Sequence, residues 1–189
     1  KIQDEDYYGG IRNAQRVLGA VRSKDEAEKY VPQALNKIGT CYIYMDRPFE
    51  AAIAYSELAR RFPKSPLASR CAFDAAKCYS QIAGITGIPA DDAQYEEALK
   101  FLTGTFPNSK EAKNVQFLVA KRIEDKARDD RKKLLEAAKE YGKVTPSAGS
   151  LYELALSRVG FCYYLYGRQT YADQIKQVKD EAAKQELKK

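Results

Sequence analysis

The feature that most constrains this chain is a pair of amphipathic patterns within residues 34–65. Apolar residues recur at helical spacing over 35–42, and a short polar break follows at 46–48. A second apolar stripe then runs over 51–62 and ends at Pro63. This spacing predicts two amphipathic helices joined by a tight turn. Because one helical hairpin cannot bury both of its faces, we expect the pattern to repeat along the chain.

Two landmarks show the pattern returning. A shift of 44 residues places the Phe-Pro-Lys-Ser sequence at 62–65 on the Phe-Pro-Asn-Ser sequence at 106–109. The dipeptide Cys-Tyr occurs near the end of the first helix of three pairs, beginning at Cys41, Cys78 and Cys162. We therefore predict a single domain, residues 1–189, made of stacked hairpins. Its parts are a half repeat at 7–22 and repeats at about 32–65, 66–109, 110–146 and 148–189, the last including a C-terminal capping helix.

The first full repeat has small, aromatic and proline landmarks at Gly39, Tyr42, Ala51, Tyr55 and Pro63. They resemble the landmark positions of the tetratricopeptide repeat (TPR) family. Helix ends that read Phe-Pro-x-Ser resemble a bacterial branch of that family, which includes the Tol-associated periplasmic protein and outer-membrane-assembly lipoproteins. The resemblance covers most of the chain, about 7–171. It implies an all-α, right-handed superhelix of about 8–9 helices that binds proteins, and the family motif contains no catalytic residues.

The residue types exclude several kinds of site. The chain has no histidine, which removes the commonest general base and metal ligand at neutral pH. Its cysteines are scattered instead of paired at the short spacing of zinc sites. We predict no metal, no cofactor and no catalytic residue, and we expect Cys41, Cys78 and Cys162 to be unpaired, buried packing residues.

Polar residues predict where several helices begin. Ser23 with Glu26 three residues later forms a capping-box pattern. Pro32 either kinks one long helix or opens a new one at Gln33. Serine is also expected to cap two later helices, at Ser65 and Ser109.

Further signals predict breaks in the helices. Two glycines and a proline indicate a non-helical insertion at 84–94. A hairpin break is expected near Asp129 and Asp130, and a turn at 146–150. Another turn is expected at 167–169, followed by a charged capping helix whose thin apolar line contains Ile175, Val178, Ala182 and Leu187.

Clustered charges do not form a recognisable catalytic pattern. Acid/base catalysis needs two carboxylates facing one cavity, whereas the acidic pairs at 91–92, 96–97, 124–125 and 129–130 are adjacent in sequence. Arg128 and the basic residues at 131–133 alternate with acidic residues and lack aromatic neighbours that stack on bases. We interpret both as solvated helix surfaces.

A candidate binding strip follows if the first helix of each hairpin lines the concave surface. Residues spaced by three and four positions share one side of a helix. Aromatics flanked by cations would suit a peptide or helix with acidic residues. The alternative is that the two central phenylalanines pack in the core. The predicted strip consists of Arg70, Phe73, Lys77, Asn114, Phe117, Lys121, Phe161 and Tyr164, with Thr40 and Tyr44 at its other end.

The sequence therefore predicts a non-catalytic scaffold or adaptor that binds a peptide or partner protein on its concave face. We expect no membrane insertion, because no apolar run approaches ~20 residues, and no nucleic acid. The alternative is an accessory module that binds nucleic acid, or assists an enzyme, through the basic third hairpin. The resemblance favours the periplasm or cell envelope of a bacterium, with the cytoplasm as the alternative. Whether the chain forms a homodimer is left open.

Overall fold

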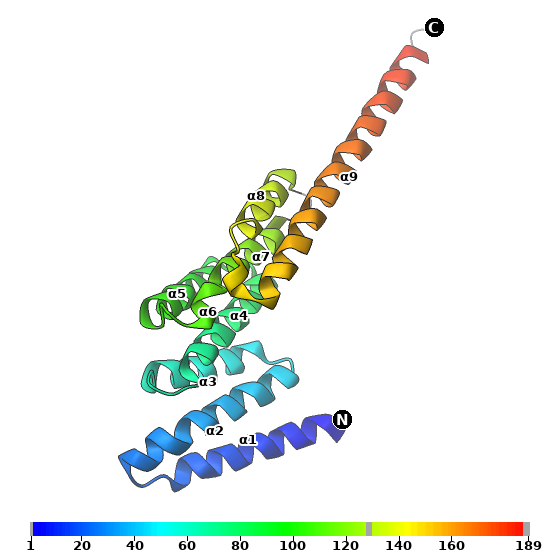
Figure 1. Cartoon of the computed structure of the whole chain (residues 1–189). Helices are drawn as coiled ribbons and strands as arrows, with labels where there is room; N and C mark the ends of the chain where they lie inside the picture. Colours follow the sequence, from blue (N-terminus) through cyan, green and yellow to red (C-terminus); the bar gives the residue numbers. More distant parts are fainter. Residues whose placement is uncertain (1, 128–129, 187–189) are drawn as a thin grey trace. The chain divides into compact units, whose positions relative to one another are not determined.

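The computed structural model describes residues 2–127 and 130–186, and every regular element among them is helical (Figure 1). The predicted all-α fold class is therefore confirmed. The chain divides into two compact units, Lys1–Val115 and Gln116–Lys189.

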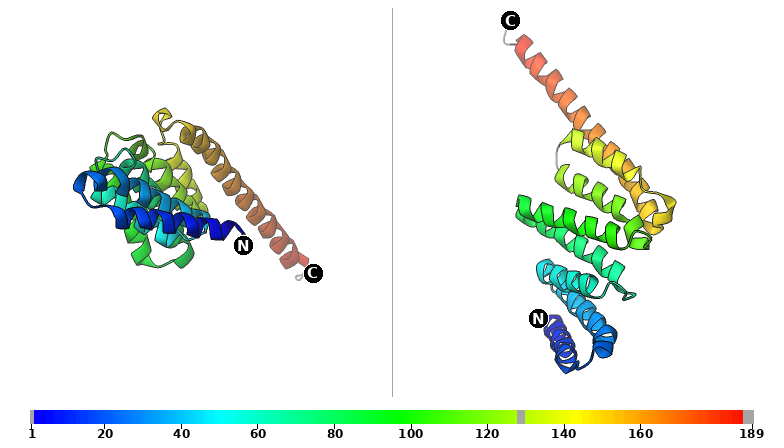
Figure 2. Two further views of the ribbon diagram at one scale, coloured as in Figure 1. Left: turned by 90° about the horizontal axis from the view of Figure 1, so that it is seen from below. Right: turned by 90° about the vertical axis from the view of Figure 1, so that its left-hand side faces the viewer.

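In the first unit, each long helix packs against the next one along the chain, because short turns reverse the chain direction between them (Figure 2). The expected helical pair at 34–65 is present as α2 and α3. The helices of this unit are α1 (Ile2–Ala20), α2 (Lys24–Tyr44), α3 (Pro48–Arg61), α4 (Ala68–Thr86), α5 (Pro89–Thr105) and the short α6 (Lys110–Lys113).

The two Phe-Pro-x-Ser segments have the same backbone geometry. Phe62 ends α3 with φ −125° and ψ 57°, and Phe106 ends α5 with φ −126° and ψ 49°. Their N–H groups donate to the carbonyls of Leu58 and Leu102, both at 2.9 Å. The serine three residues later donates its N–H to the phenylalanine carbonyl, again at 2.9 Å in both turns. The sequence repeat is thus also a repeat of structure in this unit.

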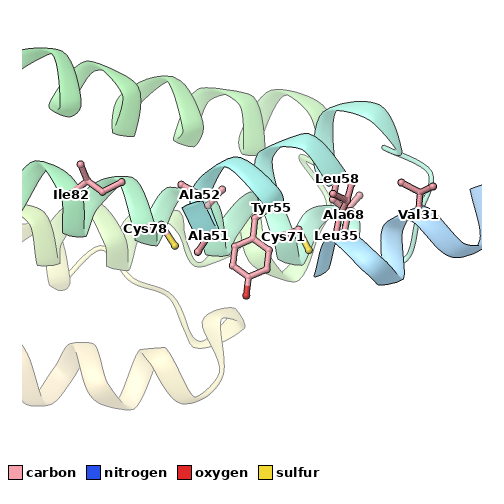
Figure 3. Close-up of a cluster of buried hydrophobic side chains, with 11 residues drawn as sticks. Val31, Leu35, Ala51, Ala52, Tyr55, Leu58, Ala68, Cys71, Cys78 and Ile82 are labelled. Atoms are coloured by element: carbon pink, nitrogen blue, oxygen red, sulfur yellow. The ribbon is translucent and has the colours of Figure 1, made fainter. Parts of the chain in front are cut away.

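The core of the first unit is built largely from small residues (Figure 3). Ala51 is fully buried, and Tyr55 and Leu58 are buried in the same cluster. Gly39 of α2 lies under the Tyr55 ring: a Cβ added there would be 2.5 Å from a ring carbon. Small side chains let neighbouring helices approach closely, so this glycine is required by packing and not by a turn.

The cysteines are buried and unpaired, as predicted. Burial raises the pKa of Cys71 and Cys78 to about 12 and that of Cys162 to about 11. Thiols with such pKa values are protonated near neutral pH and therefore poor nucleophiles. Their position is consistent with packing residues, and Cys71 also donates its S–H to Asn36 Oδ1 at 3.4 Å.

Serine begins the helices largely where the sequence indicates. Ser23 Oγ accepts the N–H of Glu26 at 3.2 Å, and the Glu26 carboxylate accepts the N–H of Arg22 at 2.8 Å. Ser109 Oγ likewise accepts a backbone N–H in the first turn of α6, at 3.0 Å. The predicted cap at Ser65 is wrong, because α4 begins at residue 68 with Leu67 at its N-cap and no side-chain cap; the Ser65 hydroxyl accepts the N–H of Leu67 in the preceding turn.

Two proline signals have different outcomes. Pro32 lies inside α2, so no new helix begins at Gln33.

The predicted non-helical insertion at 84–94 is wrong, because only two residues separate α4 from α5. Gly87 ends α4 in the left-handed conformation with φ 66°, and Pro89 is the first residue of α5. These residues are suited to ending and starting helices, so they mark a tight corner instead of a long loop.

The second unit contains α7 (Val115–Ala127, which begins one residue before it), α8 (Arg131–Tyr141), a short 3-10 turn η1 (Pro146–Ala148) and α9 (Ser150–Glu186). Asp130 Oδ1 caps α8 by accepting two backbone N–H groups, at 2.9 and 3.3 Å. The predicted hairpin break is therefore confirmed at Asp130, and Asp129 lies outside the described residues. The predicted turn at 146–150 is also present, with Gly149 at φ 62°.

The predicted turn at 167–169 is wrong, because α9 runs without a break through it. A single glycine in a helix costs only ~1 kcal/mol relative to alanine, and the Thr170 hydroxyl donates to the carbonyl of Tyr166 at 2.9 Å in helical register. The predicted last hairpin is therefore one helix within the described residues, and α9 extends past α8 (Figure 1). Leu187 of the expected capping helix lies outside them.

Candidate functional site

A groove is present on the first unit where α3 and α5 flank α4, with a volume of about 350 Å³. Its floor is formed by alanines from all three helices, and their short side chains leave the space open. They are Ala59, Ala72, Ala75 and Ala98. We call this hollow the α3–α5 groove.

The walls of the α3–α5 groove carry large apolar side chains. Phe49 and Ile53 lie one helical turn apart on α3 and are 55% and 50% exposed. The Tyr79 ring of α4 lines the groove, and its hydroxyl lies 3.4 Å from Ser56 Oγ. The polar end of this ring therefore has a partner within the unit, and the ring adds apolar surface.

One end of the α3–α5 groove is marked by an ion pair between its flanking helices. Arg60 Nη2 lies 2.9 Å from Glu97 Oε1, and the guanidinium lies 4.8 Å from the ring centroid of Phe101. Because both charged side chains are more than half exposed, the pair is expected to contribute at most ~1 kcal/mol to stability. Together with Ser56 and Gln94, this pair gives the groove a polar part beside its apolar side chains.

This arrangement is suited to binding and carries no recognisable chemistry for group transfer. Arg60 and Glu97 are the charged residues of the groove lining, and they bond to each other. Across the described ranges, 2–127 and 130–186, no group of three or more Cys, Asp or Glu residues is placed to hold a metal ion. A hollow that combines exposed apolar side chains with polar groups has the mixed character of protein interfaces.

The predicted binding residues on α4 do not form the lining of an open groove. Phe73 is buried at 7% exposure. Arg70 and Lys77 are exposed, and both bind the carboxylate of Asp74, at 2.8 and 3.3 Å. The alternative interpretation, in which Phe73 packs in the core, is the one that its burial supports.

The next predicted set has a similar outcome. Phe117 is 6% exposed and its ring centroid lies 5.4 Å from that of Tyr141. Lys121 bonds to both carboxylate oxygens of Asp125 at 2.9 Å. Asn114 is 8% exposed and separates α6 from α7, a break that the sequence did not indicate. Burial again favours core packing over an open aromatic strip.

The remaining aromatic residues of the predicted strip are exposed. Tyr44 is 66% exposed and stacks on Tyr7, with ring centroids 5.2 Å apart. Phe161 and Tyr164 on α9 are 41% and 61% exposed, and the Arg158 guanidinium lies 4.6 Å from the Phe161 ring centroid. The Thr40 hydroxyl, by contrast, is partly buried and lies within hydrogen-bond distance of the Tyr55 hydroxyl, at 3.3 Å.

Sequence reasoning missed Phe49 and Ile53, the most exposed apolar residues of the α3–α5 groove. It examined the first helix of each hairpin, whereas these residues lie on a second helix. A signal was present, because both fall outside the apolar stripe that Tyr55 and Leu58 define on α3. Large apolar residues on the otherwise polar side of an amphipathic helix indicate an interaction surface.

A buried ionic cluster holds the second unit together. Tyr141 donates its hydroxyl to Glu124 Oε2 at 2.7 Å, and Arg158 donates Nε–H to the same oxygen at 3.0 Å. The Glu124 side chain is only 8% exposed, and burial raises the pKa of Tyr141 well above its usual value. Because this cluster links α7, α8 and α9, we interpret it as a structural contact that holds the three helices together.

Two residues of the basic run, Arg131 and Lys133, form ion pairs. Arg131 Nη2 lies 2.8 Å from Asp173 Oδ2, and Lys133 Nζ lies 4.0 Å from Asp130 Oδ2. Arg128 lies outside the described residues. These contacts agree with a salt-bridged helix surface and do not favour a nucleic-acid site.

Comparison with family models, with curated protein sequences and with solved structures finds no match for this chain. Among the residues that the structure describes, no helix is both long and apolar enough to span a bilayer.

Proposed function

We propose that this protein is a non-catalytic scaffold or adaptor whose α3–α5 groove receives an amphipathic helix of a partner protein. The observation that carries the proposal is the exposure of Phe49 and Ile53 beside a floor of alanines. Large apolar side chains gathered around a hollow typically mark a protein interaction site.

The shape of the groove favours a helical occupant. The groove runs along α3 from Phe49 to Arg60, a length of about 16 Å or three helical turns. The alanine floor lets the backbone of an incoming helix approach closely. Such a helix would present apolar side chains at spacings of three, four and seven residues.

The chemistry of the proposed partner differs from the acidic partner expected from the sequence. Lys77 and Lys121 are paired with neighbouring carboxylates, so they offer less attraction to an acidic ligand. We expect the α3–α5 groove instead to take apolar side chains beside Phe49 and Ile53 and polar ones beside Arg60 and Glu97. The resemblance of the hairpin landmarks to TPR proteins supports scaffold work, and its bacterial-envelope branch supports the periplasm or cell envelope as the compartment.

The groove is tested with peptides selected on the intact chain from a displayed library of amphipathic helices. Removing a buried anchor from an interface commonly costs ~2 kcal/mol or more, which is about thirtyfold in affinity. Ile53→Asp should therefore weaken the selected peptides by at least about thirtyfold in a fluorescence-anisotropy titration. Ile85→Asp is the matched control, because Ile85 is 73% exposed and lies outside the groove lining.

The far-ultraviolet circular dichroism of both variants should match that of the unmodified chain. Peptides that bind Ile53→Asp as tightly as the unmodified chain would show that the groove is not the site. A selection that enriches no peptide with an apolar face would count against the proposal in the same way.

A further inference from the structure

Helix α9 has two apolar faces, and its own unit covers only one of them. The covered face includes Ala155 and Cys162, both fully buried. The other face carries large side chains with exposed fractions between 39% and 66%. They are Leu154, Phe161, Tyr164, Tyr171 and Ile175, which we call the α9 stripe.

The α9 stripe has the spacing of a coiled-coil seam. Positions 154, 161, 168 and 175 are seven residues apart. Positions 157, 164 and 171 lie three residues after the first three of these. An apolar pattern with this average period of 3.5 residues is typical of a helix that supercoils with a second helix. Ser157 and Arg168 are the two polar residues in the seam over this range.

Two glycines border the α9 stripe. Gly160 and Gly167 lie inside the helix, and a Cβ added at either would meet no atom within 4 Å. Each glycine costs the isolated helix up to ~1 kcal/mol relative to alanine, and nothing in the unit uses the space beside it. Small residues at this position would let the backbone of a second helix approach.

The distal half of α9 has little support from its own unit. Every residue from 171 to 177 is exposed, although Asp173 makes an ion pair with Arg131. Helical segments with few tertiary contacts are only marginally stable in water. A partner helix along the α9 stripe would supply the missing contacts.

We infer that a second copy of this chain covers the α9 stripe, with the two α9 helices packed antiparallel. The inference concerns a different surface from the α3–α5 groove and does not depend on it. Both copies carry the same seam, so one chain provides both halves of a closed, two-fold interface.

The charge of Arg168 selects the antiparallel arrangement. In a parallel pair, residues at the same position face each other, and two Arg168 side chains would repel in the centre of the seam. An antiparallel pair centred between positions 164 and 168 places each Arg168 against the Tyr164 ring of the other copy. A guanidinium over an aromatic face is attractive. The same register brings Phe161 opposite Tyr171.

The oligomeric state is tested by sedimentation equilibrium of the full chain over a range of concentrations. We expect a dimer, and Tyr164→Lys, which places a second cation opposite Arg168, should raise its dissociation constant by at least about thirtyfold. Tyr163→Lys is the matched control: Tyr163 is 52% exposed on the same helix but lies off the stripe, so its effect should stay within about threefold. Tyr171→Lys is a second variant, and it should weaken the dimer as Tyr164→Lys does.

The orientation is tested by disulfide formation under mild oxidation, since the native cysteines are buried. A mixture of Tyr164→Cys and Arg168→Cys chains should form a mixed disulfide dimer. Efficient linkage of Arg168→Cys to itself would show a parallel pair and overturn the arrangement. A chain that stays monomeric at about 100 μM, or a dimer unaffected by Tyr164→Lys and Tyr171→Lys, would overturn the inference.

Discussion

Replacing Gly39 by alanine tests whether close helix packing, rather than helix propensity, decides stability in the first unit. In most helix interiors this change stabilises by ~1 kcal/mol, because alanine is the better helix former. Here the new Cβ would lie 2.5, 2.7 and 2.8 Å from three ring carbons of Tyr55. Carbon atoms do not approach so closely, so the ring or the helix has to move.

The magnitude follows from the surroundings of Tyr55. The ring is 5% exposed, so it has little room to move, and overpacking of this kind costs ~1–3 kcal/mol. Displacing the ring also disturbs the contact between its hydroxyl and Thr40 Oγ1 at 3.3 Å, a hydrogen bond worth ~1 kcal/mol. After the gain in helix propensity is subtracted, Gly39→Ala should lower the free energy of unfolding by about 2 kcal/mol.

The assay is urea unfolding of the whole chain, followed by far-ultraviolet circular dichroism. Gly9→Ala is the matched control, because Gly9 lies inside α1 and a Cβ there meets no atom within 4 Å. That variant should gain up to ~1 kcal/mol. In a Tyr55→Leu background, Gly39→Ala should be much less harmful. Equal stabilisation by both glycine substitutions would refute the reasoning.

Two further predictions concern buried groups. Tyr141→Phe removes the hydroxyl that donates to Glu124 at 2.7 Å, so urea unfolding should show a loss of ~1.5–3 kcal/mol. Tyr163→Phe, an exposed control, should cost almost nothing, and equal effects would contradict the buried cluster. Burial raises the pKa of Cys71 and Cys78 from 9.0 to about 12, so their protonated thiols stabilise the fold fully below pH 9.0, and this contribution is lost as the pH rises toward 12. The urea midpoint should fall over that range more steeply than in a Cys71→Ala/Cys78→Ala variant, and parallel pH curves would show that the thiols are not the cause.

Local patterns in the sequence were sufficient for the α2–α3 pair and for several helix ends, but not for the corner between α4 and α5. The apolar periodicity of α2 and α3, the cap at Ser23 and the Phe-Pro-x-Ser turns depend on neighbours a few residues away. The same holds for Asp130 at the start of α8. Burial of the cysteines was also predictable, because small apolar side chains at repeated positions fall on the inner side of each hairpin.

Other features depend on which helix faces meet in space, and the sequence alone did not decide them. The periodicity shows that Phe73 and Phe117 share a face with cations, but only the packing shows that this face is covered. Gly87 and Gly167 look alike as breakers, yet one ends a helix and the other lies inside one. In the same way, the exposure of Phe49 and of the α9 stripe follows from the absence of a neighbouring helix over those residues within the described ranges. A residue's type limits what it can contact, and the tertiary structure decides whether that contact is made, because burial depends on segments distant in sequence.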